Sequence, residues 1–292
     1  MAAAKVQELE TRTTPQWVTV LRRLAKHKAA MAGLVILVML VVLAVLAPAI
    51  APYSPTDGDF ASYLQPPGGA HWMGTDDQGR DVFTRVLFGL RLSLVVGLIS
   101  VSIGAVVGVT LGALAGFKGG WLDNAVMRVM DILLAFPIML LALAIVIGLG
   151  QGLDKAIIAV GIVSIPQYAR ITRGAVIQVR ENDYVQAARA TGATELRALL
   201  KHIMPNIFAP LLVRATLGTS EAVLETAGLS FLGLGAKLPT PELGLMIARS
   251  REHFYDAPYL IYFPGLAITL MILALNLLGD GLRDALDPRL KR

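Results

Sequence analysis

Few residues of this sequence stand at spacings that support catalysis or metal binding. The chain has no cysteine, which excludes thiolate ligands, cysteine nucleophiles and disulfides. The acidic stretch "GTDDQGRD" at 74–81 lacks the carboxylate spacing of an EF-hand, so we interpret it as a capped outer loop leading into a helix. Each of the four histidines lacks a second ligand at metal spacing and is interpreted as structural: His27, His71, His202 and His253.

The sequence motifs of nucleotide hydrolysis and of common hydrolases are missing. No G-x-x-x-x-G-K-[ST] loop occurs, so the chain itself is not expected to bind ATP. No G-x-S-x-G or H-E-x-x-H motif occurs either. We therefore predict no catalytic residue, no metal site and no cofactor in this chain, and do not expect it to be an enzyme by itself.

Three charged residues interrupt an otherwise apolar region, namely Arg214, Glu221 and Glu225. Ionisable residues inside membrane spans are costly and mark pairs, wet cavities or transport pathways. The two glutamates share a helix face at i, i+4. We predict that these residues pair with one another or line a translocation path. An ion-gradient-driven transporter is the alternative of another class, and a structural membrane scaffold is a second.

The composition is that of a membrane protein. Of 292 residues, 55% are hydrophobic and only 16% are charged, with a mean hydropathy of +0.64. A soluble domain carries about 25% charged residues. The net charge of +5 is better explained by membrane orientation than by nucleic acid.

Stretches of about 20 apolar residues predict membrane spans. We expect an all-α integral membrane protein with about six transmembrane helices, at 29–50, 90–117, 125–150, 156–169, 207–234 and 260–278. The third is expected to contain Pro137 and the fourth Pro166. The second carries four glycines spaced four apart, which predicts close packing against another helix: Gly104, Gly108, Gly112 and Gly116.

The distribution of Lys and Arg predicts the orientation. With both termini in the cytoplasm, eighteen Lys and Arg fall in the inside segments and seven in the outside ones. The expected organisation is a cytoplasmic N-terminal segment (1–28), a first transmembrane helix (29–50), an extracytoplasmic loop (51–89), a core transmembrane domain (90–283) and a cytoplasmic tail (284–292).

One polar stretch, "YVQAARATGATELRALLKHIMPN" at 184–206, lies in the hydrophobic half of the chain. Asn182 or Asp183 can cap a first helix, Gly192 suits the left-handed position at its end, and Thr194 can cap a second. The second helix is expected to end at Pro205 and to carry one apolar stripe, formed by Leu196, Leu199, Leu200 and Ile203. Ala187 and Ala188 give the first helix a flat patch that a partner could approach. The alternative is an amphipathic connector lying on the lipid surface.

The segments "QAARATG" and "HIMPN" resemble the EAA loop of binding-protein-dependent ABC importer permeases. Gln186 stands where Glu is usual and Met204 where Leu is usual. Four further segments resemble the second (C-type) permease of the dipeptide/oligopeptide/nickel group: "HWMGTDDQGRDVFTRVLFGLRLSL", "DNAVMRVMDILLAFP", "LSFLGLGAKLPTPELG" and "NLLGDGLRDALDPRLKR". The resemblance covers about residues 20–292.

The resemblance implies a type I (MetI-like) permease fold in the inner membrane and an importer of di- or oligopeptides, with nickel or glutathione as alternatives. It implies three kinds of partner besides lipid: a B-type permease, two ATPase subunits that bind ATP and Mg, and an extracytoplasmic substrate-binding protein. No nucleic acid is expected. The loop at 180–206 would couple to the ATPases. The residues implied in coupling are Gln186, Ala187, Ala188, Gly192, Leu196, Leu199 and Pro205.

Overall fold

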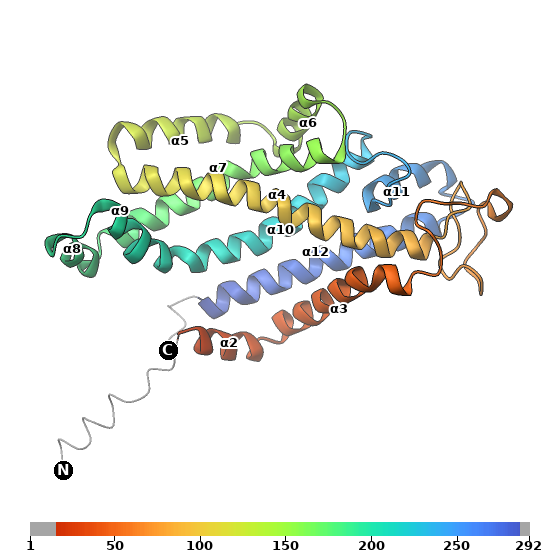
Figure 1. The fold of residues 1–292 in the computed structure, drawn as a ribbon, viewed down its shortest axis with the longest axis horizontal. Coiled ribbons are helices and arrows are strands. Elements are labelled where there is room, and N and C mark those ends of the chain that lie inside the picture. The colour runs from red at the N-terminus through yellow and green to blue at the C-terminus, as the bar shows by residue number, and fades with distance from the viewer. Residues whose placement is uncertain (1–15, 287–292) are drawn as a thin grey trace, which may run out of the picture.

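The computed structural model describes residues 16–286, and these form a bundle of helices (Figure 1). The predicted segments at 1–28 and 284–292 therefore lie partly outside the described residues. Short 3-10 and π-helical turns join some of the main helices. The main helices are α2 (Gln16–Lys26), α3 (Lys28–Ile50), α4 (Val82–Lys118), α5 (Gly120–Leu134), α6 (Ile138–Leu149), α7 (Leu153–Arg180), α8 (Asp183–Ala190), α9 (Glu195–Arg197), α10 (Phe208–Phe231), α11 (Leu243–Arg249) and α12 (Tyr259–Leu286).

Within residues 16–286, four helical stretches are long and apolar enough to cross a membrane, namely α3, α4, α12 and the stretch Glu195–Phe231 that ends with α10. The pair α5 and α6 would make a fifth span if its two parts are taken together. Helix α7 has 28 residues, about 42 Å at 1.5 Å per residue, so it is long enough although its composition is more polar. Each of the six predicted spans therefore corresponds to helical structure.

The third predicted span is not one straight helix. Helices α5 and α6 meet at 94°, and Pro137 stands at the N-cap of α6. Proline lacks the N–H that a continuing helix needs, and it disfavours helical geometry in the residue before it. The span predicted over 125–150 is therefore broken at Pro137 into two helices.

Two other predicted boundaries also differ. Helix α4 begins at Val82 rather than at residue 90, because Asp81 caps it by accepting a 2.8 Å hydrogen bond from Thr84 N. The loop predicted to end at residue 89 therefore ends at Asp81. Helix α7 continues through Pro166 to Arg180, well past the predicted end near residue 169.

The glycine ridge of α4 packs directly against α7, as predicted. An added Cβ at Gly108 would lie 2.6 Å from the carbonyl oxygen of Ile165, and at Gly116 it would lie 2.8 Å from that of Arg173. At Gly112 it would collide with the backbone of Ala169. Only glycine permits so close an approach of two helix backbones, so α4 and α7 form a tight seam along the bundle.

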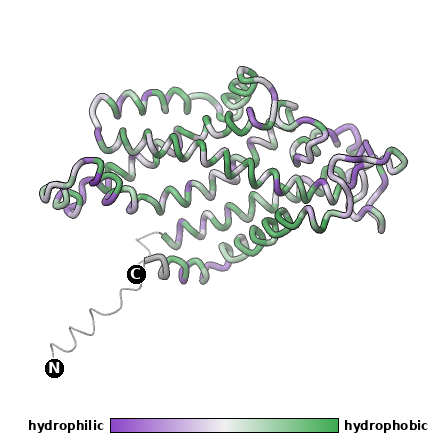
Figure 2. The backbone as a smooth tube through the Cα atoms, viewed as in Figure 1, coloured by the Kyte–Doolittle hydropathy of each residue, from purple (hydrophilic) through white to green (hydrophobic). Residues whose placement is uncertain are grey.

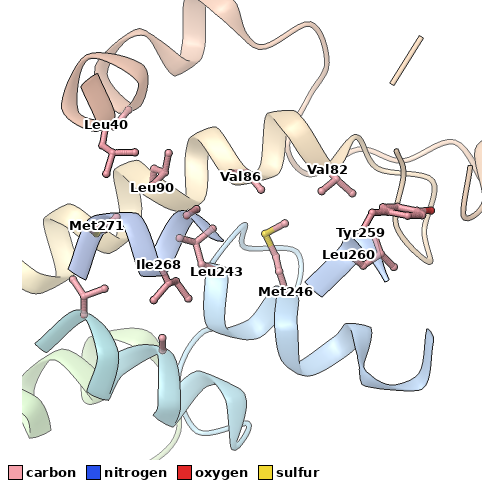
Figure 3. Packing of buried hydrophobic residues seen from close by; sticks show 14 of the residues in the cluster. Leu40, Val82, Val86, Leu90, Leu243, Met246, Tyr259, Leu260, Ile268 and Met271 are labelled. Carbon is pink, nitrogen blue, oxygen red and sulfur yellow. The ribbon is translucent and has the colours of Figure 1, made fainter. Parts of the chain in front are cut away.

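The polar residues gather at the two ends of the bundle (Figure 2). One end carries α8, α9 and the end of α12. The distribution of Lys and Arg predicts that this end faces the cytoplasm, and we call it the cytoplasmic end. The other carries the 51–81 loop and α11, and we call it the outer end. There an apolar core joins α3, α4, α11 and α12, with Leu40, Val86, Leu243 and Met271 among its buried side chains (Figure 3).

Candidate coupling, pathway and outer sites

The polar stretch at the cytoplasmic end folds into the two helical pieces predicted from the sequence. Helix α8 follows Asn182, which occupies the N-cap in an extended conformation but makes no side-chain capping bond. Gly192 has φ +90°, the left-handed geometry expected at the end of the first helix. Thr194 caps α9 by accepting a hydrogen bond of 3.4 Å from Arg197 N. Local sequence rules therefore account for the turn.

The second helical piece differs from its prediction. After α9 the backbone forms a π-helix (Ala198–Ile203) and a 3-10 turn (Met204–Ile207), and then runs into α10. Pro205 lies in the first turn of the 3-10 segment, where a missing N–H costs no intrahelical hydrogen bond, so it does not end the helical path. The prediction of a stop at Pro205 was wrong.

The predicted apolar stripe divides into two faces. Leu199 and Ile203 are buried, whereas Leu196 and Leu200 are 66% and 58% exposed. Because π-helical hydrogen bonds run from i to i+5, the side chains depart from the 3.6-residue period on which the prediction rested. Leu199 and Ile203 thus anchor the piece, and Leu196 and Leu200 are left on the surface.

The helix pair is anchored on the ends of the tight α4–α7 seam. Val185, Leu199 and Ile203 pack with Phe117 of α4 and Val176 of α7 in one buried cluster. The guanidinium of Arg189 lies 5.0 Å from the centre of the Phe117 ring. A displacement of the helix pair would therefore act on both helices of the seam.

The remaining face of α8 is open. Gln186 and Ala187 are exposed and Ala188 is half-buried. The Gln186 side-chain amide donates to the carbonyl oxygen of Glu181 at 3.2 Å, within its own segment. The residues left on the outside of this segment are Ala187 and the half-buried Ala188 of α8, Leu196 of α9 and Leu200 of the π-helix, and we call these four the cytoplasmic face.

The charged residues predicted in the fifth span lie close together in the structure. Arg214 forms an ion pair with Glu221 at 2.6 Å, and its guanidinium also donates to Gln167 of α7. Glu225 lines the same small pocket one turn further along α10. The arginine therefore pairs with one glutamate, rather than the two glutamates with each other. The sequence analysis missed Gln167, although a polar residue beside Pro166 was a usable signal.

Arg214 also lines a second, larger cavity. A groove of about 580 Å³ opens between α7, α10 and the end of α12 near the cytoplasmic end. Arg214 therefore stands between this groove and the pocket that holds Glu221 and Glu225.

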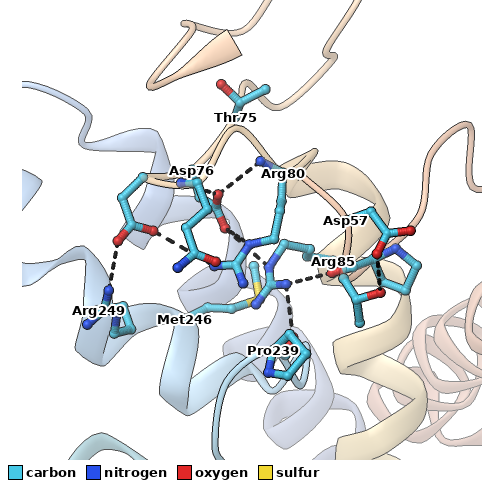
Figure 4. Close-up of polar contacts among 12 residues, drawn as sticks. Asp57, Thr75, Asp76, Arg80, Arg85, Pro239, Met246 and Arg249 are labelled. Atoms are coloured by element: carbon cyan, nitrogen blue, oxygen red, sulfur yellow. Dashed lines mark hydrogen bonds and ion pairs between the residues drawn. The ribbon is translucent and has the colours of Figure 1, made fainter. Parts of the chain in front are cut away.

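The outer end is closed by buried polar contacts. We call this region, residues 51–85 with 232–257, the outer cap (Figure 4). Arg80 and Arg85 are each only 2% exposed. Arg80 Nε donates to Asp76 at 2.8 Å, and Arg85 donates to the carbonyl oxygens of Pro55 (2.6 Å) and Pro239 (3.2 Å). One arginine thereby holds together segments that are far apart in the sequence.

The acidic stretch at 74–81 uses its carboxylates within the outer cap. Asp77 pairs with Arg249 at 2.9 Å, and Asp81 pairs with His71 at 2.9 Å while capping α4. Within the described residues, no group of three or more His, Asp and Glu is placed to hold a metal ion. Nearby, burial raises the pKa of Glu242, and the backbone N–H groups of Gly244 and Leu245 that donate to it act in the opposite direction.

Comparison with known protein families assigns the chain. Residues 108–292 match the family described as "Binding-protein-dependent transport system inner membrane component", and residues 15–67 match the "N-terminal TM domain of oligopeptide transport permease C". The chain belongs to this family of transport-system permeases and is a multi-pass component of the inner membrane. It is the permease part of an ABC transporter that works with ATPase subunits and depends on a binding protein, and it is not itself an enzyme.

Individual relatives agree with this assignment. The chain is 46% identical over 94% of its length to a dipeptide transport system permease protein of Alkalihalophilus pseudofirmus, covering 90% of that protein. It is 48% identical over 91% of its length to a di/tripeptide transport system permease protein of Pseudomonas aeruginosa, again covering 90%. A glutathione transport system permease protein of Pectobacterium atrosepticum is 43% identical over 94% of this chain and 92% of its own length.

A solved structure confirms the fold. The inward-facing MetNI methionine ABC transporter matches with a TM-score of 0.58 at 21% identity, over 70% of this chain and 97% of that one. The predicted MetI-like permease fold is therefore correct. The family assignment also decides against the ion-gradient and scaffold alternatives.

Proposed function

We propose that this chain is one of two permease subunits in an importer of di- or oligopeptides. The relatives of Alkalihalophilus pseudofirmus and Pseudomonas aeruginosa carry names that specify dipeptide and di/tripeptide transport. A B-type permease would form the other half of the path. A glutathione importer is the second candidate, favoured by the relative of Pectobacterium atrosepticum, and glutathione is itself a small peptide.

The observation that carries the proposed coupling role is the combination of an open cytoplasmic face and a buried anchor. Small side chains at Ala187 and Ala188 allow another backbone to approach, and Leu196 and Leu200 offer apolar area. Val185 and Ile203 tie the same helices to the α4–α7 seam. Two ATPase subunits, holding ATP and Mg, would dock here and on the partner permease, while a binding protein would deliver the peptide to the outer end. Gln186, Gly192, Leu199 and Pro205 would shape and orient this docking element.

The proposed path follows Arg214, Glu221 and Glu225. A charge facing lipid costs at least about 2.5 kcal/mol, so an ion pair at this depth indicates contact with protein or water. The position of Arg214 between the groove and the pocket supports a role in the path. A peptide carries a carboxylate and an ammonium group, and these can pair with the same three side chains as it passes.

The test is transport by the complete complex in proteoliposomes. Labelled dialanine should accumulate with the binding protein and ATP, and an ionophore that collapses ion gradients should leave the uptake unchanged. Arg214→Gln should lower uptake, whereas Arg170→Gln, which removes an exposed pair with Asp131, should change it less than twofold. Uptake of glutathione but not of dialanine would favour the second candidate, and uptake of neither would contradict the proposal.

A further inference from the structure

Helix α2 carries a basic surface that faces away from the bundle. Arg22, Lys26 and Lys28 are exposed, and Arg22 and Lys26, four residues apart, share one face of the helix. Arg23 adds a further, half-buried cation. Residues 16–50 contain no aspartate or glutamate, so this stretch has no negative charge of its own.

The nearby end of α12 does not cancel this positive charge. It carries Asp280, Arg283 and Asp284, which together contribute one negative charge. Within residues 16–286, Asp284 pairs with His27 Nε2 at 3.3 Å, and the four basic side chains at 22–28 take part in no ion pair. A net positive surface therefore remains even with a neutral histidine.

The packing of α2 places this surface at the depth of lipid headgroups. Only His27 separates α2 from α3, whose 23 residues measure about 34 Å and can cross a hydrocarbon core of about 30 Å. On its other side α2 lies along the end of α12 (Figure 1), where Leu24 is buried in one cluster with Ala285. Because the last turns of α12 are charged, both neighbours place α2 just outside the hydrocarbon.

The outer surface of α2 is a better site for an anion than the cavity beside it. That cavity, of about 220 Å³, is lined by Arg23 and His27 but also by the carboxylate of Asp284, which opposes an anion. On the outer surface, Leu21 is 55% exposed and directly precedes Arg22. An exposed apolar side chain next to cations is typical of helices that bind at a membrane interface.

We propose that α2 and Lys28 form a binding surface for the headgroups of anionic phospholipids. Arg22, Lys26 and Lys28 pair with phosphate oxygens, to which guanidinium and ammonium groups donate charge-assisted hydrogen bonds. Leu21 contacts the start of the acyl chains. Clusters of four or more Lys and Arg next to a membrane span are attracted to anionic lipid. An acidic segment of a partner subunit is the competing occupant, but the direct continuity of α2 with the span α3 favours lipid.

The test places a fluorescent probe on α2 in the complete transport complex. Because this chain has no cysteine, Ala25→Cys at an exposed position of α2 gives it a single labelling site, in a complex whose other subunits lack reactive cysteines. Quenching of the probe is measured in phosphatidylcholine vesicles that contain spin-labelled phosphatidylglycerol or spin-labelled phosphatidylcholine. Half-maximal quenching should require at least fivefold less of the labelled phosphatidylglycerol.

A double variant tests which residues cause this preference. Arg22→Gln together with Lys26→Gln should reduce the difference between the two lipids to less than twofold. Arg23 and Lys28 remain in this variant and keep a positive charge at this end of α3 for membrane orientation. The matched control, Lys237→Gln together with Arg251→Gln, removes two exposed cations near the outer end and should leave the preference unchanged.

Four results would overturn the proposal. Two of them are equal quenching by the two lipids when the basic residues are intact, and an unchanged preference in the double variant. Loss of a partner subunit from the double variant would assign the surface to that protein. Loss of the preference on addition of inorganic phosphate at constant ionic strength would assign it to free phosphate.

Discussion

The outer cap and the cytoplasmic face, at the two ends of the same bundle, differ in which side chains they bury and which they expose. In the outer cap, charged side chains are buried and bonded to one another, and Arg85 reaches carbonyl groups 30 and 154 residues away. On the cytoplasmic face, Ala187, Leu196 and Leu200 are exposed and Ala188 is half-buried. The outer cap is closed by its own residues, whereas the cytoplasmic face is open, as the proposed docking of an ATPase requires.

The two ends should therefore respond differently to substitution. Changes in the outer cap and in the α4–α7 seam should lower stability, because they remove or obstruct contacts within the chain. Changes on the cytoplasmic face should leave the fold intact and alter assembly. Comparable losses of stability from substitutions in the outer cap and on the cytoplasmic face would contradict this expectation.

The largest effect is expected from Arg85→Met. The substitution leaves the carbonyl groups of Pro55 and Pro239 without their shared donor and removes a charge near Asp76. Breaking a buried polar pair of this kind costs about 3–5 kcal/mol. Thermal unfolding of the purified complex should show this loss. Arg251→Met, which removes an exposed arginine 4.7 Å from the Phe231 ring, should cost less than about 1 kcal/mol.

A smaller effect is expected in the seam from Gly112→Ala. The added methyl group collides with the backbone of Ala169, and such overpacking costs about 1–3 kcal/mol. Gly265→Ala is the matched control, because an added Cβ there has no atom within 4 Å. Unfolding midpoints should separate the two variants, and equal midpoints would show that the seam is not tightly packed.

The smallest loss of stability is expected from Gly192→Ala. An added Cβ at Gly192 meets no atom within 4 Å, so the cost comes only from φ +90° and amounts to about 1–2 kcal/mol. Gly174→Ala is also free of close contacts but lies inside α7, where alanine is favoured by about 1 kcal/mol. The two variants should thus shift the unfolding midpoint in opposite directions. A shift in the same direction would show that stability does not depend on the left-handed conformation of Gly192.

Sequence reasoning worked best where short-range rules decide the structure. The left-handed Gly192, the Thr194 cap and the glycine ridge of α4 each follow from neighbours or from a fixed spacing. It failed where the backbone left the regular α-helical period. Leu196 and Leu200 were predicted to share one apolar stripe with Leu199, because no feature of the local sequence predicts the π-helix.

Two prolines show most clearly what the local sequence cannot predict. Pro137 breaks its helix whereas Pro166 is contained in α7, although both lie in apolar stretches. Pro166 is buried in the folded bundle, and this tertiary environment cannot be predicted from the local sequence. The same holds for the site residues: Arg85 and Gln167 acquire partners only when distant segments meet.

The central claim is that the cytoplasmic face couples this permease to its ATPases, and Ala187→Trp tests it most directly. Ala187 is exposed, so a bulky side chain should leave the fold unchanged while holding the partner's backbone away. Ala25→Trp, at an exposed alanine of α2, is the matched control. The measurement is the amount of ATPase subunit that co-purifies with each variant at equal permease yield. We predict at least a tenfold loss for Ala187→Trp and none for Ala25→Trp; full retention of the ATPase by Ala187→Trp would contradict the claim.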